Sequence, residues 1–294
     1  MRVLKGKDVA EQTYGELRER CAHFVGRYGY APSLAVVLVG DDPASSSYVA
    51  SKGKACEDLG FSHVDYHLGE DVGEAELLSL ICTLNGDDTV HGILVQLPLP
   101  PHIDEEVVIK TIAVEKDVDG FHPESVGNLL IGRSGFVSCT PLGIMHMLDY
   151  YQIETAGKHV VIVGRSNIVG KPMASLLIQK GRDATVTICH SRTEDLPSIT
   201  RQADILIAAI GRPLFITASM VKEGCTVIDV GINRVEDPSR TRGYRLVGDV
   251  DFESVAPKSS AITPVPGGVG VMTIAMLMHN TMVAAEQLAA KREQ

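Results

Sequence analysis

Residues 160–172 read VVIVGRSNIVGKP, and this stretch decides the fold of the second half of the chain. Its four leading residues are apolar, which is typical of a buried strand in a parallel sheet, and the apolar run at residues 173–178 predicts a helix. Glycine at the corner between them lets the backbone approach a ligand closely. The new helix offers unpaired N–H groups and the positive end of its dipole. The stretch therefore predicts an anion cradle of the dinucleotide-binding type.

The cradle departs from the standard G-x-G-x-x-G fingerprint, because Ser166 replaces the second glycine and the next glycine is Gly170. An ordinary strand-to-helix turn is the structural alternative. The following strand favours a nucleotide site, since it ends without the acid that usually binds the ribose 2′-hydroxyl of NAD. Arg165, Ser191 and Arg192 supply guanidinium and hydroxyl groups that suit a 2′-phosphate. The sequence thus favours NADP over NAD.

The composition indicates enough apolar material for two cores. The 294 residues are 45% hydrophobic, and a chain of this length usually forms about two domains. The net charge of −10 argues against electrostatic attraction to nucleic acid or to an anionic membrane. An anionic ligand must therefore be held by local positive groups such as those of the cradle.

Cysteine usage and the apolar segments indicate the compartment. None of the six cysteines forms a C-x-x-C pair, so we expect buried thiols in a reducing environment. No metal site is expected, because no H-E-x-x-H or comparable ligand spacing occurs. The N-terminus has no apolar signal region, and the apolar segment at residues 269–278 is too short to span a bilayer. The sequence predicts a soluble cytoplasmic protein without a membrane contact.

Helix and strand patterns alternate through the chain, which predicts parallel sheets with right-handed crossovers. The expected helices of the first half lie at residues 7–25, 46–59 and 74–84. The expected strands lie at residues 34–39, 64–67, 92–97, 160–163, 185–189, 205–208 and 226–230.

These patterns predict an α/β protein with two domains. Residues 1–140 are expected to form a catalytic α/β domain. Residues 141–270 are expected to form a Rossmann-like doubly wound domain that binds NADP, entered through a helix at residues 142–151. The C-terminal helix is expected to return to the first domain, so that residues 271–294 complete it. Ligands are then expected in a cleft between the two domains.

Tyr48 and Lys52 stand four residues apart on one face of the helix expected at residues 46–59. Such a pair can be simple surface decoration. This helix, however, follows a tight turn after a buried strand, so its first turns lie at the carboxyl end of the sheet, where open α/β sheets bind ligands. Short-chain dehydrogenases also carry Tyr-x-x-x-Lys, but after their glycine loop, whereas this pair precedes the loop.

Three further segments carry polar or rigid residues where strands end. Gln96 is either a solvated strand end or, if it faces Lys52, a hydrogen-bond partner for the amine. Asp117 and Asp119 point the same way if their segment is extended, although Asp117 also fits an ordinary Asx turn. Residues 263–270 read TPVPGGVG, in which prolines fix the path while glycines let the backbone lie flat against a planar ligand.

Together these segments resemble the bifunctional methylenetetrahydrofolate dehydrogenase/cyclohydrolase family in its bacterial form. They occur in the family's order over nearly the whole chain, and their combination is highly specific. The matching segments are residues 48–56, 95–100, 116–120, 139–143, 164–172, 229–233 and 263–270.

The resemblance implies catalytic roles in the first half of the chain. Lys52 would be the catalytic lysine, and Gln96 would support it. Tyr48 would pack on the folate, and Asp119 would hold the pterin ring. The implied reaction is oxidation of 5,10-methylenetetrahydrofolate to the 5,10-methenyl compound with NADP, followed by hydrolysis to 10-formyltetrahydrofolate.

The resemblance also implies a cofactor site in a homodimer joined through the nucleotide domain. Gly164, Arg165 and Ser166 would hold the cofactor phosphates, Ser191 would assist, and the backbone near Ile232 would meet the nicotinamide. The residues implied to line the substrate cleft are Pro264, Pro266, Gly267 and Gly268.

Two positions depart from the family pattern, because Ser138 and Val271 stand where the family usually has proline. Both departures bear on loop rigidity and folate fit more than on the type of reaction. The alternatives are a dehydrogenase with weak or no cyclohydrolase activity or with a preference for NAD, and a non-catalytic folate- or nucleotide-binding module.

The implied hydrolysis sets a requirement on Lys52. An unperturbed lysine has a pKa of about 10.4, whereas a base that is useful near neutrality needs a pKa of about 7–8. This difference corresponds to about 4 kcal/mol in favour of the neutral amine. Partial burial and a cationic substrate can supply that bias, so we expect the amine to be shielded from solvent.

Overall fold

Ser33–Val39 forms the central strand of the first sheet because each of its seven residues is buried. This strand, β2, pairs in parallel with β3 (Ser62–Leu68) and β4 (Gly92–Val95), in the order β3-β2-β4. The sheet belongs to unit 2, which contains Glu11–Cys139 and the chain from Ile274 onward. The structure, a computed structural model, describes residues 1–240 and 243–293.

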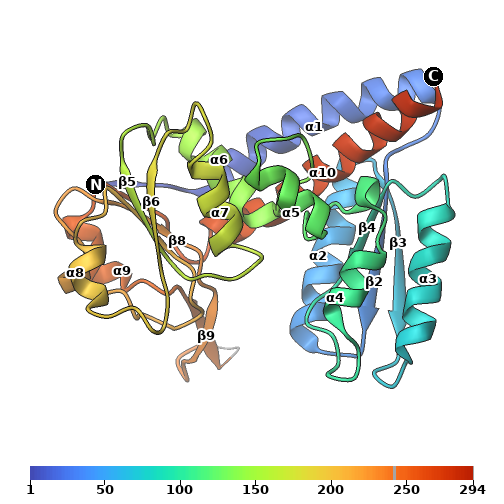
Figure 1. The fold of residues 1–294 in the computed structure, drawn as a ribbon. Helices are drawn as coiled ribbons and strands as arrows, with labels where there is room; N and C mark the ends of the chain where they lie inside the picture. Colours follow the sequence, from blue (N-terminus) through green and yellow to red (C-terminus); the bar gives the residue numbers. More distant parts are fainter. Residues whose placement is uncertain (241–242, 294) are drawn as a thin grey trace. The chain divides into compact units, whose positions relative to one another are not determined.

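The helices of unit 2 pack on this sheet (Figure 1). Apolar residues of α3 (Glu74–Gly86) and α4 (Glu105–Thr111) share a buried core with alternate residues of β2. α2 (Pro43–Leu59) packs against β2 and β3. A 3₁₀ turn at Val114–Lys116 and α5 (Pro123–Leu130) follow α4.

α2 begins three residues before the expected Ser46, because its start is capped. The Asp42 carboxylate accepts a hydrogen bond from the Ser45 N–H at 2.7 Å, and Pro43 occupies the first turn, where its missing N–H costs nothing. The helix ends at Gly60, whose left-handed backbone (φ 75°) closes it. The cap sets the start of α2 and therefore the number of helical turns that precede Lys52.

Unit 1 contains Met1–Ala10 and Thr140–Thr273, and its sheet has six parallel strands. The strand order is β1-β11-β8-β7-β5-β6. The strands are β1 (Arg2–Val3), β5 (His159–Val163), β6 (Thr185–Cys189), β7 (Ile205–Ala208), β8 (Thr226–Asp229) and β11 (Ala261–Ile262). Its helices are α6 (Cys139–Tyr150), α7 (Gly170–Leu177), α8 (Leu196–Thr200) and α9 (Phe252–Val255), with 3₁₀ turns at Ala218–Met220 and Ala256–Lys258.

The expected α/β class and the doubly wound parallel sheet are confirmed, but several short elements are additions to the sequence-based picture. These are α4, α5, α8, α9, β1, β11 and an antiparallel hairpin of β9 (Asn233–Glu236) and β10 (Tyr244–Val247). β1 pairs in parallel with β11, so the first residues of the chain extend the sheet of unit 1.

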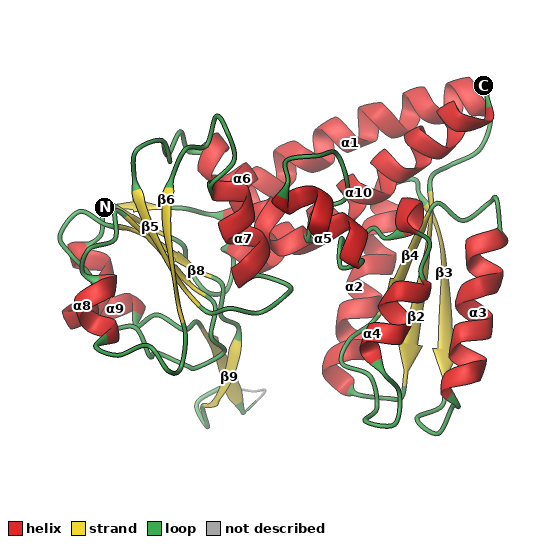
Figure 2. Cartoon of the chain, viewed as in Figure 1, coloured by secondary structure: helices red, strands yellow, loops and turns green. Residues whose placement is uncertain are grey.

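α10 (Val269–Arg292) is the one helix in residues 1–240 and 243–293 that is long and apolar enough to cross a membrane by composition, and most of it is buried. In unit 2 it runs beside α1 (Gly6–Tyr28), as Figure 2 shows, and the Arg20 guanidinium holds both carboxylate oxygens of Glu286 at 3.2 and 2.6 Å. The expected return of the C-terminal helix to the first domain is confirmed. α10 is a core helix.

Candidate active site

The amine of Lys52 lies against Gln96 in unit 2. Nζ of Lys52 donates to Oε1 of Gln96 at 2.8 Å, and both side chains are half-buried. Gln96 cannot turn freely, since its Nε2 donates to the Leu97 carbonyl at 2.7 Å and its backbone N–H donates to the Val37 carbonyl at 2.8 Å. The second hydrogen bond continues the β2–β4 ladder by one residue. The sheet therefore aims the amide oxygen at the lysine.

Asp119 and Cys139 form a second wall beside this amine. The thiol of Cys139 donates to the Val118 carbonyl at 3.5 Å and lies 3.9 Å from Oδ1 of Asp119. Burial, with the nearby Asp119 carboxylate, raises the pKa of the Cys139 thiol well above its usual range, so the thiol stays protonated and acts as a donor.

Burial governs the charge state of this group. It lowers the pKa of Lys52, and the neighbouring Asp119 carboxylate opposes that change. Burial also raises the pKa of Asp119, and Lys52 opposes it in turn. Both carboxylate and amine are thus biased toward their neutral forms. Burial therefore makes the neutral amine of Lys52 easier to form than that of an exposed lysine.

Of the two alternatives for the segment at residues 117–119, the structure shows the turn and not the extended chain. The chain forms a 3₁₀ turn at Val114–Lys116 and then bends. The buried Asp117 carboxylate accepts from the Phe121 N–H at 3.1 Å, the His122 N–H at 2.9 Å and the Ser125 hydroxyl at 2.8 Å. Burial raises the pKa of Asp117 to about 6. Asp117 shapes the loop, as its alternative Asx-turn interpretation predicts.

Tyr48 lies on α2 one turn before Lys52, and it is 45% exposed. Its ring is therefore available to a planar ligand beside the amine. Across residues 1–240 and 243–293, no group of three or more His, Cys, Asp or Glu side chains is arranged to hold a metal ion.

The glycine corner of unit 1 has the shape that the sequence predicts. Gly164 follows β5 with φ 133°, and a Cβ there would collide with the Ala209 carbonyl. A Cβ at Gly170 would collide with the Gly164 carbonyl. The Ser166 hydroxyl accepts from the N–H groups of Val169 and Gly170 at 3.1 and 3.4 Å, which explains a serine where the fingerprint has glycine. Two glycines thus bring the start of α7 against the end of β5.

Exposed polar side chains surround this corner. Arg165 follows Gly164, and Ser191 and Arg192 follow β6, the strand paired with β5; all three are exposed. In parallel strands the carboxyl ends meet at one edge, so these guanidinium and hydroxyl groups lie at the same edge of the sheet as the glycine corner.

Two buried carboxylates fasten the loops that follow β7 and β8. Asp249 accepts from the backbone N–H groups of Ile210, Gly211 and Arg212 at 2.7, 3.0 and 2.8 Å. Asp229 accepts from the N–H groups of Gly231, Asp249 and Val250 at 3.0, 2.9 and 3.0 Å, and burial raises its pKa to about 6.

The loop held by Asp229 presents Ile232, which is 45% exposed. Gly270 lies close to this side chain, since a Cβ there would lie 2.6 Å from Cδ1 of Ile232. The two buried carboxylates therefore hold the Ile232 loop at the carboxyl edge of the sheet.

The loop at residues 263–268 lies beside the start of α1 within unit 1. Gly267 has φ 96°, and its carbonyl accepts from the Gly6 N–H at 3.0 Å. A Cβ at Gly268 would collide with the Pro264 carbonyl. Pro264 is half-buried and Pro266 is exposed, so the loop has both an anchored and an open side.

The two departures from proline lie at helix starts. Ser138 is buried directly before α6, and Val271 is the third residue of α10 and is 36% exposed. Proline is tolerated in the first turn of a helix, so either position could hold it without breaking a helical hydrogen bond.

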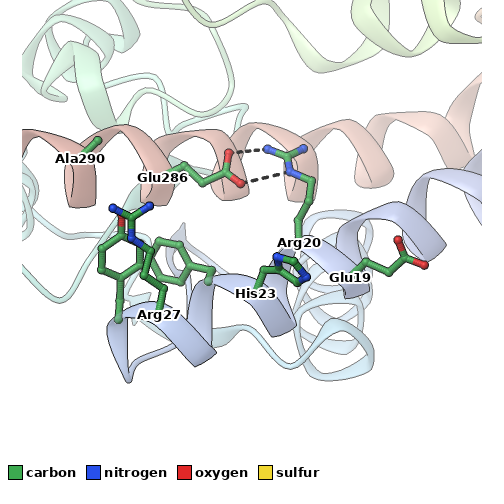
Figure 3. A pocket seen from close by; sticks show the side chains of 8 residues that line it. Glu19, Arg20, His23, Arg27, Glu286 and Ala290 are labelled. Atoms are coloured by element: carbon green, nitrogen blue, oxygen red, sulfur yellow. Dashed lines mark hydrogen bonds and ion pairs between the residues drawn. The ribbon is translucent and has the colours of Figure 1, made fainter.

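A groove of about 620 Å³ between α1 and α10 is separate from these residues (Figure 3). Arg20 and Arg27 line it; Arg20 pairs with Glu286 of α10 and Arg27 with Glu293, the residue directly after α10, at 2.6 Å in both cases. The groove contains none of the candidate residues named above.

Sequence reasoning missed Cys139, Asp249 and Asn280 as site-building residues. Asn280 reaches Cys139 from 141 positions away, with Nδ2 3.7 Å from Sγ. Contacts at such separation leave no periodic pattern in the sequence. In the sequence, Cys139 stood out only as part of the segment at residues 139–143, and Asp249 looked like an ordinary loop residue.

Two domain models of one protein family match the chain. The description "Tetrahydrofolate dehydrogenase/cyclohydrolase, catalytic domain" matches residues 4–119, and "Tetrahydrofolate dehydrogenase/cyclohydrolase, NAD(P)-binding domain" matches residues 138–289. The bifunctional protein FolD of Chlorobium phaeobacteroides is 56% identical over 286 residues, which cover 96% of this chain and 97% of that protein.

Two solved structures are similar over nearly their full length. The bifunctional FolD enzyme of Campylobacter jejuni has a TM-score of 0.93 and 52% identity, covering 98% of this chain and 99% of that one. The Trypanosoma brucei methylenetetrahydrofolate dehydrogenase-cyclohydrolase, solved with NADP cofactor and inhibitor, has a TM-score of 0.92 and 41% identity, covering 97% of both chains.

Proposed function

The chain belongs to the tetrahydrofolate dehydrogenase/cyclohydrolase family, and from this premise we propose that it oxidises 5,10-methylenetetrahydrofolate with NADP and hydrolyses the 5,10-methenyl product to 10-formyltetrahydrofolate. The observation that carries the proposal is the half-buried amine of Lys52, held at 2.8 Å by an amide that the sheet keeps in place. We assign the folate chemistry to unit 2 and the nucleotide to unit 1.

The residues of unit 1 fit an NADP molecule. The glycine corner brings the start of α7 against the end of β5, since a Cβ there would collide with backbone. Gly164, Arg165 and Ser166 would hold the diphosphate at the start of α7. Arg165, with Ser191 and Arg192, would bind the 2′-phosphate. The Ile232 loop would face the nicotinamide. NADP, when bound, supplies the hydride acceptor.

In unit 2 the oxidation needs orientation rather than acid–base help, because the lone pair of the folate nitrogen drives hydride loss. Tyr48 would stack on the folate, and Asp119 would bind the pterin ring. The loop of Pro264, Pro266, Gly267 and Gly268 in unit 1 would lie along the substrate.

Hydrolysis needs a base and then an acid. Nζ of Lys52, in its neutral form, would take a proton as water adds to the methenyl carbon. The same ammonium would return that proton to the ring nitrogen when the carbon–nitrogen bond breaks. The remaining hydroxyl proton would pass to solvent as the carbonyl forms, which gives the 10-formyl product. Gln96 would orient the amine throughout. The cationic substrate alongside further disfavours a charged lysine before the attack.

We also propose a cytoplasmic homodimer joined through the edge strand of unit 1. β6 is an outer strand of the six-stranded sheet, and Ile188 on it is 39% exposed. An outer strand offers unpaired N–H and C=O groups to a second copy, and closed two-fold pairing satisfies both.

Replacement of the amine tests the mechanism. Lys52→Met should lower the rate of methenyl-folate hydrolysis by a factor of about 10² or more, since a positioned general base contributes that much. NADP affinity should stay unchanged, because the nucleotide residues lie in unit 1. Absorbance of methenyl-folate follows hydrolysis, and calorimetry measures NADP binding.

Lys54→Met is the matched control, because Lys54 is an exposed lysine of the same helix that pairs with Asp58 at 3.2 Å. It should retain hydrolysis. A Lys52→Met enzyme that hydrolyses at the wild-type rate would exclude Lys52 as the base. A wild-type enzyme that reduces NADP but accumulates methenyl-folate would show the dehydrogenase-only alternative.

A further inference from the structure

Asn280 ties together three segments of unit 2. It is 4% exposed and lies on α10. Its Nδ2 donates to the Val118 carbonyl at 2.8 Å and to the Val137 carbonyl at 3.0 Å, and it lies 3.7 Å from Sγ of Cys139. Val118 directly precedes Asp119, and Val137 lies two residues before Cys139. One amide therefore spans the two segments that carry the wall beside Lys52.

These two segments are also in close backbone contact. Gly120 has φ 70°, and a Cβ there would lie 2.5 Å from the Val137 carbonyl carbon and 2.6 Å from the Ser138 nitrogen. The turn after Asp119 thus rests on the backbone at Val137 and Ser138. The amide of Asn280 links the same two segments through its hydrogen bonds to the Val118 and Val137 carbonyls.

The Asp119 carboxylate depends on this arrangement for its position. The carboxylate accepts from the Cys139 thiol at 3.9 Å, a weak contact. On the far side of the turn, Asp117 is fixed by three hydrogen bonds of its own. The place of the Asp119 carboxylate is therefore set mainly by its backbone, which Asn280 holds at Val118.

We propose that Asn280 is a positioning residue of the folate site, which holds Asp119 and Cys139 at their working distance from Lys52. This inference rests on the proposed function of Lys52 and Asp119, and adds to it a residue that touches neither substrate nor cofactor. The C-terminal helix thereby contributes to catalysis through the wall that it braces.

The charges around the amine give this role a measurable consequence. The charges of Asp119 and Cys139 interact with the Lys52 amine and change its pKa. Asp117 interacts electrostatically with both Asp119 and Cys139. The Asp119 carboxylate raises the pKa of Lys52. If Asp119 moves away, the amine loses that attraction and becomes neutral at a lower pH. The acid limb of the hydrolysis profile should then move to lower pH.

The test compares Asn280→Leu with the wild-type enzyme in both reactions. Leucine keeps the volume and removes the donor. Hydrolysis should fall about tenfold or more in kcat/KM, and the KM for the folate should rise in both reactions, because a displacement of about 1 Å can cost up to 10² in rate. The KM for NADP should not change. Asn280→Ser, which keeps a shorter donor, should lie between the two enzymes and serves if the leucine variant does not fold.

Thr281→Val is the matched control, because Thr281 is the next residue, is fully buried and donates its hydroxyl to the Leu277 carbonyl of its own helix, at 2.8 Å. It should keep the wild-type folate KM and pH profile. Asn280 variants that match Thr281→Val in folate KM and pH profile, and differ only in melting temperature, would overturn the inference. Activity of Lys52→Met would instead overturn the proposed function, so the two failures are distinguishable.

Discussion

Lys52 and Gln96 lie 44 positions apart. The sequence places the start of the helix of Lys52 and the strand end of Gln96 at the carboxyl end of one sheet, and the structure joins the two side chains by a hydrogen bond. Parallel-strand topology makes that proximity predictable. The thiol of Cys139 and the amide of Asn280 were not predictable, because their contacts depend on how α10 packs. For Asp117 the sequence left two alternatives, an extended segment and an Asx turn, and the 3₁₀ turn before it decides for the turn.

Arg165 is the residue that should decide cofactor choice. Arg165→Ala should weaken NADP binding by about 1.5–3 kcal/mol, the range for a hydrogen bond to a charged group, and leave NAD binding nearly unchanged. Titration calorimetry with each nucleotide measures the difference. Arg201→Ala is a suitable control, because Arg201 follows α8 and precedes β7, at the opposite edge of the sheet. Equal losses for NADP and NAD would show that the guanidinium does not read the 2′-phosphate.

At the level of elements, buried strands were the easiest to predict. β2 and β5 are runs of apolar residues, and both lie in the expected places. α4 has only seven residues, too few for a helical period to stand out, and the β9–β10 strands are largely polar and exposed. Short or exposed elements are fixed by their tertiary neighbours and leave little pattern in the sequence.

The corner between β5 and α7 should tolerate no side chain. Gly164→Ala should destabilise unit 1 by about 2 kcal/mol more than Gly157→Ala, because overpacking adds to the backbone strain. Gly157 also has a positive φ, 69°, but an added Cβ would meet no atom of the described chain within 4 Å. Urea unfolding measures stability, and NADP affinity should fall only in Gly164→Ala. Equal destabilisation would mean that the Ala209 carbonyl can move aside.

At the level of the whole molecule, the proposed dimer predicts a different outcome for the two sheets. Ile188→Lys on β6 should give a monomer in sedimentation velocity, since a buried charge at the pairing edge is costly. Val64→Lys on β3, an outer strand of the sheet in unit 2, should remain a dimer, although Val64 is 46% exposed. A dimeric Ile188→Lys protein would place the interface elsewhere.

The chain passes between the two units at residues 10–11, 139–140 and 273–274. During synthesis, the ribosome therefore releases β1, Lys52 and Asp119 early, then the other five strands of the sheet of unit 1, and only afterwards the stretch of α10 that carries Asn280. A nascent chain halted before that stretch would contain the complete glycine corner of unit 1. The segments of Asp119 and Cys139 beside Lys52 would still lack the hydrogen bonds from Asn280. Expression of either half of the gene alone would leave each unit short of a strand or a helix that the other half encodes.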